Sequence, residues 1–288
     1  MKTLKILLIA LVFGACNQSI NKDLVTGATS RGDGLSCDDI SIQINKESVK
    51  RNTFTFGETV VFSFNHIKGF KEENGKVYPE MSMVVIKKEN QMVLSNLNLL
   101  NLKDGTNLSP LKLEANFSAN FPYQNNEEYE VQITIWDTKG EGKFTYNMPF
   151  TIKGNEHIKA ETTDITYKSI FLWNENKSKM VLNNRLNSKE KYALVIEGVS
   201  GLKIENGKVH PELSLLLTDA KGNILIANKN LYNNLPNGLD VSKLTEGQIP
   251  VILTFNGDEF FNPYHLNVVL KDTKSDKKLI IETDLEIE

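Results

Sequence analysis

The sequence is poor in cysteine and carries little net charge, and both absences exclude classes of protein. It contains two cysteines, Cys16 and Cys37, so a framework of several disulfides is excluded and the folded regions must depend on their hydrophobic cores. The formal net charge is −3, with the charges spread over the chain. Nucleic acid is not expected as a partner, because phosphate binding needs clustered lysine and arginine.

The sequence also lacks the motifs of common enzymes and cofactor sites. It contains no GxSxG, HExxH or CxxC pattern and no glycine-rich phosphate loop. We therefore expect no catalytic residue and no cofactor. The acidic turns Asp137–Glu141 and Asp272–Asp276 contain oxygen ligands but do not match the EF-hand pattern, so we interpret them as solvated hairpin tips and expect no metal site.

The one long apolar run lies at the N-terminus. Lys2 and Lys5 give this region positive charge, and Ile6–Phe13 is too short to cross a bilayer as a stable helix. Two small residues, glycine and alanine, follow it and lead directly to Cys16. This ending resembles the lipobox of bacterial lipoproteins, although a phenylalanine stands where that pattern usually has leucine.

The resemblance implies that residues 1–15 are a signal peptide and that Cys16 is acylated, for example with palmitate, and attaches the chain to a membrane. The alternative is an ordinary signal peptide with an incidental cysteine. Asn17 replaces the aspartate of inner-membrane lipoproteins, which favours the outer membrane of a cell envelope. Residues 16–35 are polar and dotted with glycine, so we expect a flexible tether.

Two segments of the sequence are repeated in the same order. GFKEENGKVYPEMSMVVI begins at Gly69 and returns from Gly201 as GLKIENGKVHPELSLLLT. YEVQITIWDTKGEGK begins at Tyr129 and returns from Tyr264 as YHLNVVLKDTKSDKK. Such a pattern indicates a duplicated folding unit. We expect two tandem domains, at residues 36–153 and 164–288, joined by a polar linker at residues 154–163.

Hydrophobic alternation predicts strands in both copies. The residues Met81, Met83 and Val85 share one face, as do their counterparts Leu213, Leu215 and Leu217. Asn-Gly pairs at 74–75 and 206–207 predict tight turns. Residues 97–102 and 239–244 could be short helices or loops. The fold class is therefore all-β, and the strand count favours two immunoglobulin-like β-sandwiches that lack the Cys–Trp–Cys core of antibodies.

Candidate binding residues follow from the repeat and from the tryptophans. Just beyond the two turns lie Tyr78, Glu80, His210 and Glu212, in segments where Pro79 and Pro211 suit an edge strand or a bulge. Aromatic rings could also pack against a sugar, and Trp136 and Trp173 are the candidates for this role.

These observations favour a non-catalytic cell-envelope lipoprotein that binds or scaffolds a protein partner. A glycan-binding lipoprotein of a nutrient-uptake system is the first alternative, and it requires an exposed tryptophan beside other aromatic residues. A hydrolase is the second alternative, and it requires a pocket in which a histidine or a carboxylate pair converges.

Overall fold

The computed structural model describes residues 18–87, 91–121, 127–235, 237–255 and 259–288. These residues form many β-strands and one short helix, α1 (Val241–Thr245). The all-β sandwich class expected from the sequence is confirmed, whereas the immunoglobulin-like topology stays a prediction. Within the same residues, no helix has the length and apolar character that crossing a membrane would need.

The chain divides into two compact units. The first comprises the described residues up to Asn52 with Val61–Asn116 and Tyr129–Pro149, and the second comprises Thr53–Val60, Phe117–Glu128 and Phe150–Glu288. This division runs through the first copy of the repeat, so the domain boundaries read from the sequence stay a prediction. Below, strands β1–β11 are called the first repeat and β12–β23 the second repeat.

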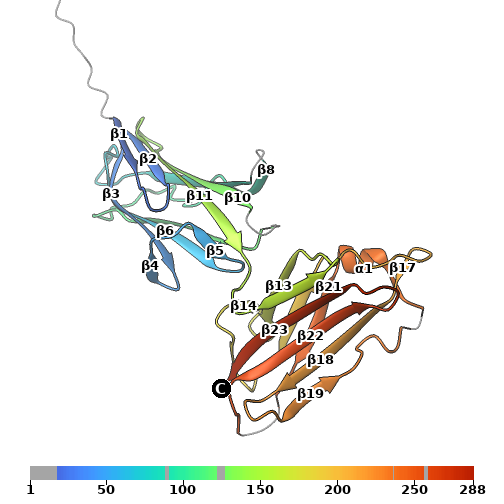
Figure 1. Ribbon diagram of the computed structural model, residues 1–288. Helices are drawn as coiled ribbons and strands as arrows, with labels where there is room; N and C mark the ends of the chain where they lie inside the picture. The colour runs from blue at the N-terminus through green and yellow to red at the C-terminus, as the bar shows by residue number, and fades with distance from the viewer. Residues whose placement is uncertain (1–17, 88–90, 122–126, 236, 256–258) are drawn as a thin grey trace, which may run out of the picture. The chain divides into compact units, whose positions relative to one another are not determined.

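The first repeat contains two sheets (Figure 1). One has the strand order β1-β2-β11-β10-β7-β8, with β5 added in parallel to β11, and the other has the order β4-β3-β6-β9. The strands are β1 (Gln18–Lys22), β2 (Thr29–Asp33), β3 (Ser36–Ile44), β4 (Glu47–Val49), β5 (Thr53–Thr55), β6 (Thr59–Lys68), β7 (Pro79–Lys87), β8 (Gln91–Asn96), β9 (Leu113–Ser118), β10 (Glu128–Asp137) and β11 (Lys143–Lys153).

The second repeat has a corresponding strand order, except that, among the described strands, β1 has no counterpart in it and that it has one additional strand pair. Its sheets have the orders β12-β23-β22-β18-β19 and β14-β13-β16-β21, with β15 added in parallel to β23 and a small β17-β20 pair. The strands are β12 (Lys159–Thr163), β13 (Ser169–Asn174), β14 (Lys179–Val181), β15 (Arg185–Leu186), β16 (Tyr192–Glu197), β17 (Lys208–Val209), β18 (Pro211–Thr218), β19 (Ile224–Asn228), β20 (Leu239–Asp240), β21 (Gln248–Leu253), β22 (Tyr264–Asp272) and β23 (Lys278–Ile287).

The register is also repeated. Pro79 faces Asp137 across β7 and β10, and Pro211 faces Asp272 across β18 and β22. Buried and partly exposed residues alternate along β7 and for most of β18, as the period of two predicted. The repetition in the sequence is thus a repetition of strand order and pairing.

The cores of the two copies use different side chains. In the first unit the two sheets meet through aromatic rings, with Phe62 5.8 Å from Tyr146 and Phe64 6.3 Å from Phe144 between ring centroids. The core of the second repeat is mainly aliphatic, with leucine, isoleucine and valine from both sheets. Among the described residues, both cores are built without a disulfide.

Two segments expected to lack structure form strands instead. Residues 18–33 of the expected tether form β1 and β2, and β2 pairs with β11. The buried residues of β2 include Ser30 and Gly32, too small and polar to produce a hydrophobic alternation in the sequence. In the expected linker, Lys159–Thr163 pairs with β23 through its backbone, and its side chains are mostly exposed. The polarity of both segments concealed their pairing.

Of the two segments that could be helices or loops, one is helical. Residues 239–244 begin as the short strand β20 and continue into α1. Residues 97–102 form an irregular loop with bends and no helix.

Candidate functional site

Each repeat contains a buried aspartate at the corresponding position. The sequence analysis wrongly interpreted both aspartates as parts of solvated hairpin tips. Asp137 ends β10 and Asp272 ends β22, and both are buried. The carboxylate of Asp137 accepts hydrogen bonds from the backbone N–H of Lys71 at 2.6 Å and of Lys139 at 2.9 Å. The repeated Asp-Thr-Lys sequence was the signal that could have identified this anchor.

The second copy of the anchor has one more donor. Asp272 accepts from the backbone N–H of Lys203 at 2.8 Å, the backbone N–H of Lys274 at 3.1 Å and the hydroxyl of Ser275 at 2.5 Å. Burial by itself raises the pKa of Asp272, but these hydrogen bonds outweigh it, and the pKa lies below its ordinary value. The carboxylate oxygens are thus occupied by hydrogen bonds, one of which holds the loop at Lys203.

The anchored loops lead into the two Asn-Gly turns. Asn74 and Gly75 have φ of 55° and 73°, and Asn206 and Gly207 have φ of 53° and 76°. Both positions of each turn are left-handed, as this turn type requires. The repeated turns therefore have a structural reason, and functional differences must lie in the residues around them.

A groove lies beside the first turn, within the first unit, with a volume of about 640 Å³. One wall is the end of β6 with the following residues 66–70, and the other includes residues 106–111. The backbone pair between Val77 and Thr106, at 2.8 and 2.9 Å, joins the turn segment to this second wall. The 106–111 segment was not identified as functional from the sequence, because the groove forms only when distant segments meet.

The groove combines apolar and charged side chains. The apolar residues of the lining are Ile67, Phe70, Val77, Leu108, Pro110 and Leu111. The charged and titratable residues of the lining are Asp38, His66, Lys68 and Glu72, and Lys68 Nζ forms an ion pair with Asp38 at 2.5 Å. Such a surface can bind a ligand that presents both apolar and charged groups.

His66 has an unusual backbone conformation in this groove. Its φ is +54°, and its side chain is exposed. The corresponding residue of the second repeat is Gly198, with a φ of +61°. Side chains other than glycine rarely adopt this region, and the cost is about 1–2 kcal/mol. The first repeat thus carries an exposed imidazole in the groove at a position where the second repeat has no side chain.

Three candidate residues are brought together in the first repeat. Trp136 of β10 faces Glu80 of β7 directly, and both are partly buried. Glu80 Oε1 accepts from the backbone N–H of Leu100 at 3.3 Å and so holds the following loop. Tyr78 lies two residues before Glu80, with Lys139 Nζ 5.2 Å from its ring centroid.

The expectation that these residues lie on an edge strand is wrong. In the first repeat β7 pairs with both β10 and β8, and in the second β18 pairs with both β22 and β19. Pro79 and Pro211 are tolerated because each is the first residue of its strand. The outer strands pair only with the later residues, from Met83 in β7 and from Leu215 in β18. Before them, loop residues take over, since Leu99 N–H donates to the Met81 carbonyl at 2.8 Å and Leu231 N–H to the Leu213 carbonyl at 2.7 Å.

The candidates of the second repeat lie in two different sheets. Glu212 faces Lys271 across β18 and β22, and the carbonyl oxygen of His210 accepts from the N–H of Thr273 at 2.9 Å. Trp173 lies on β13 in the other sheet, partly buried, with its ring 6.5 Å from that of Phe171. The strand pairing does not place Trp173 beside His210 or Glu212.

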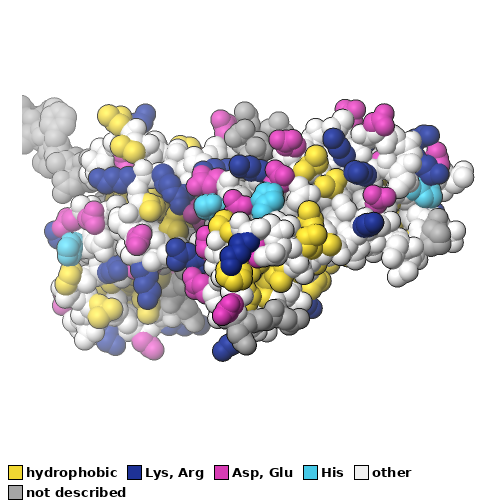
Figure 2. Space-filling model, turned by 60° about the horizontal axis from the view of Figure 1, so that its bottom comes forward, with side chains coloured by type: hydrophobic (Ala, Val, Ile, Leu, Met, Phe, Trp, Pro, Cys, Tyr) yellow, Lys and Arg dark blue, Asp and Glu magenta, His cyan; other side chains and the backbone are white. Residues whose placement is uncertain are grey.

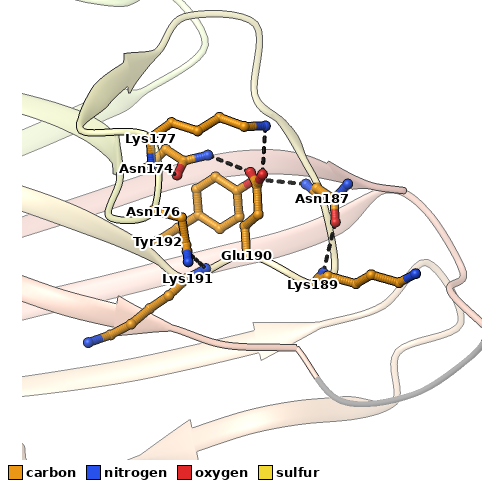
Figure 3. A network of polar contacts seen from close by, with 8 residues as sticks. All are labelled: Asn174, Asn176, Lys177, Asn187, Lys189, Glu190, Lys191 and Tyr192. Carbon is orange, nitrogen blue, oxygen red and sulfur yellow. Dashed lines mark hydrogen bonds and ion pairs between the residues drawn. The ribbon is translucent and has the colours of Figure 1, made fainter.

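A polar cluster surrounds Glu190 in the second repeat (Figure 3). The Glu190 carboxylate accepts from Asn174 Nδ2 at 2.6 Å and from the Tyr192 hydroxyl at 2.9 Å, and it pairs with Lys177 Nζ at 2.6 Å. The Tyr192 oxygen in turn accepts from the N–H of Asn187 at 2.8 Å. Such a bond from a tyrosine to the preceding loop resembles the tyrosine corner of β-sandwiches.

The chemistry of this cluster favours a structural role. The hydrogen bonds and charge of Lys177, followed by the bond from Asn174, lower the pKa of Glu190 to about 2. A carboxylate with this pKa stays ionised near neutral pH and is a poor general acid. We interpret the cluster as a clamp between the 174–190 loop and the start of β16.

Cys37 lines a second hollow of the first unit, about 540 Å³ in volume. Its thiol lies 3.3 Å from the carbonyl oxygens of Asp39 and Asn65 and can donate to either. Burial raises the pKa of Cys37 to about 11. The reactive thiolate is therefore disfavoured at neutral pH.

No cluster of three or more histidine, cysteine, aspartate or glutamate residues suited to a metal occurs within the described parts of the chain. On the face shown in Figure 2, basic and acidic side chains are interspersed, with apolar side chains in small groups between them.

Comparisons with known proteins give no family. No family model matches the chain, and no curated protein matches it. The chain has a likeness to a solved structure titled pT26-6p, at 10% identity and a TM-score of 0.26, covering 94% of this chain and spanning 65% of that one. A second likeness, to the three FKBP domains of wheat FKBP73, has 10% identity, a TM-score of 0.13 and coverage of 79% and 95%. Similarities this low carry no argument about fold or function.

Proposed function

We propose that this protein is a lipid-anchored, non-catalytic binding or scaffolding module of the cell envelope. The groove between residues 66–77 and 106–111 binds an extended segment of a protein partner. The lipid on Cys16 holds the module at a membrane, in accordance with the lipobox resemblance, and the outer membrane is the favoured location. Cys16 itself lies outside the described residues.

The observation that carries this proposal is the composition of the groove. Six apolar residues lie beside Asp38, His66, Lys68 and Glu72, a mixture that suits a peptide with alternating apolar and charged side chains. His66 supports the choice of this copy, because it occupies a left-handed position where the second repeat has Gly198.

The same composition favours a protein over a glycan as partner. Sugar binding depends on flat aromatic rings exposed in a shallow groove. Among the described residues that line the groove, Phe70 supplies the aromatic ring, and neither tryptophan is part of the lining. Glycan binding remains the alternative, and it would use the partly buried Trp136 on another part of the first unit.

Site-specific photocrosslinking in intact cells tests the proposal. A photoreactive phenylalanine analogue replaces Leu108, which is 65% exposed in the groove, in the full acylated chain. We expect a discrete protein adduct that disappears when Phe70→Asp is added. The matched control carries the analogue at Ile224, which is also 65% exposed but lies in the second repeat, and it should give no such adduct.

The contrary results are equally specific. Equal adducts at positions 108 and 224 would show that the contact is nonspecific. No adduct at Leu108, together with retention of the purified chain on an immobilised polysaccharide that Trp136→Ala abolishes, would favour the glycan alternative.

A further inference from the structure

The hairpin that begins the described chain exposes large apolar side chains. Ile20 on β1 is 70% exposed, and Leu24 and Val25 in the β1–β2 turn are 88% and 65% exposed. Strand β1 is the edge strand of its sheet and pairs only with β2 among the described strands (Figure 1). Several large apolar side chains exposed together on one hairpin are typical of an interaction surface, whereas a single exposed apolar residue needs no such explanation.

The turn that carries Leu24 and Val25 is held in a fixed shape. The backbone of Asp23 donates to Ala28 at 2.8 Å and accepts from Gly27 at 2.9 Å. The Asp23 carboxylate accepts from the N–H of Val25 at 2.8 Å and from the hydroxyl of Thr26 at 3.1 Å. The two apolar side chains therefore point outward from an ordered turn and do not fold back onto the sheet.

The short distance in sequence between Cys16 and β1 indicates which surface lies near this hairpin. Strand β1 starts at Gln18, two residues after Cys16, and two residues of chain span at most about 7 Å. The expected long tether is replaced by a paired strand. If Cys16 carries acyl chains, the N-terminal end of β1 must therefore lie at the bilayer surface.

We propose that β1 lies along the bilayer surface, with Ile20, Leu24 and Val25 inserted into the boundary between headgroups and acyl chains. This inference depends on the acylation of Cys16 in the proposed function. The lipid holds one end of β1, the turn inserts at the other end, and Ile20 lies between them. The contact adds apolar burial to the lipid anchor, as in other proteins that lie in the interface.

The surrounding polar groups limit the depth of insertion. The outer backbone N–H and C=O groups of an edge strand need partners that the hydrocarbon core cannot supply. Lys22 is exposed on the same strand and can reach lipid phosphates, whereas the bonds to the Asp23 carboxylate stabilise its charge without a lipid partner. The side chains thus enter the interface while the backbone stays at headgroup level.

Spin labels at two exposed leucines test this contact. Leu24→Cys and Leu97→Cys are labelled separately in the acylated Cys37→Ser chain, in vesicles of phosphatidylethanolamine and phosphatidylglycerol. Leu97 is a matched control because it is 69% exposed and follows β8, at the opposite edge of the same sheet. The measurement is the ratio of collision rates with oxygen, which concentrates among acyl chains, and with a water-soluble nickel chelate.

We expect the ratio for the Leu24 label to be roughly fivefold that of the Leu97 label, as for a side chain in the interface. Equal ratios for a chain that floats with the vesicles would overturn this inference alone. A chain that does not float and whose Cys16 carries no acyl mass would overturn the proposed anchoring as well, so the two failures are distinguishable.

Discussion

Replacing Asp272 by asparagine should destabilise the second repeat, because the substitution keeps the size of the side chain and removes its charge. The carboxylate accepts from Lys203 and Ser275 on one oxygen and from Lys274 on the other. An asparagine can present its oxygen to one of these sides only. Its NH₂ group then faces a donor, and at least one buried N–H or O–H loses its acceptor.

The magnitude follows from the number and type of these bonds. A hydrogen bond to a charged group contributes about 1.5–3 kcal/mol, and leaving a buried donor without an acceptor costs a similar amount. We expect Asp272→Asn to lower the free energy of unfolding by about 2–3 kcal/mol. With a typical urea slope for a small domain, the midpoint then falls by about 1 M.

Tryptophan fluorescence can assign this loss to the correct unit. The sequence has two tryptophans, Trp136 in the first unit and Trp173 in the second, so a Trp136→Phe background reports on the second unit alone. Urea titration at pH 7 compares Asp272→Asn with its parent. Asp276→Asn is the control, because Asp276 is an exposed acidic residue of the same hairpin.

The pH dependence gives a second check with a defined sign. The pKa of Asp272 is lowered in the folded state, so its stabilisation is complete above its ordinary value of 3.8 and is lost as the pH falls through the folded value. The gap between parent and variant should therefore shrink below about pH 4. Equal midpoints for Asp272→Asn and Asp276→Asn at pH 7 would refute the anchor.

Three further predictions concern other parts of the chain. Gly201→Ala should lower the free energy of unfolding in urea titration by about 3 kcal/mol, since φ is +103° and a Cβ would collide with a carbonyl oxygen. Gly207→Ala is the control, because Gly207 lies in open space at φ +76°, and it should lower this free energy by only about 1–2 kcal/mol. Equal losses for the two variants would contradict the collision at Gly201. Iodoacetamide should alkylate Cys37 at pH 8 roughly 100-fold more slowly in the folded than in the unfolded chain, because burial raises the pKa of the thiol from 9.0 to about 11. Equal rates would show that the folded chain has an accessible thiolate. Glu190→Gln should lower the melting temperature at pH 7. The difference from the parent should disappear as the pH falls from 4.5 to about 2, since the pKa of Glu190 is lower in the folded than in the unfolded chain. Calorimetry that finds no difference at pH 7 would contradict the clamp.

Strands with bulky alternating residues could be predicted from the sequence, because burial of one face imposes a period of two. Met81, Met83 and Val85 show this pattern, and the structure buries all three. Strand β2 could not be predicted in this way. Its inward positions carry Ser30 and Gly32, which are too small and polar to leave a hydrophobic signal.

The local sequence pattern could not predict whether a strand lies at the edge or in the interior of a sheet. Pro79 fits an edge strand and equally fits the first residue of an internal strand, and the pairing of the later residues Met83–Lys87 with β8 shows that β7 is internal. The groove was missed for a related reason. Its wall at Leu108 and Leu111 is a loop without periodicity, and it meets His66 through contacts between distant segments.

The aspartate anchors were missed although a signal was present. Asp137 and Asp272 recur at the same place in both copies, but an aspartate near a turn ordinarily suggests exposure. Their burial depends on backbone N–H groups from a loop more than sixty residues away in each case. Such a partner becomes visible only when the chain is folded.

Because these anchors bind backbone amides, they do not depend on the side chains of the loops that they hold. Lys71 and Lys203 are fixed through their N–H groups, so the next positions can differ freely, and they carry an exposed Glu72 in one copy and an exposed Ile204 in the other. Loop segments could therefore be exchanged between the two repeats without loss of the frame. The duplicated sandwich is in this respect a scaffold for grafting, whose surface chemistry can be redesigned separately from its stability.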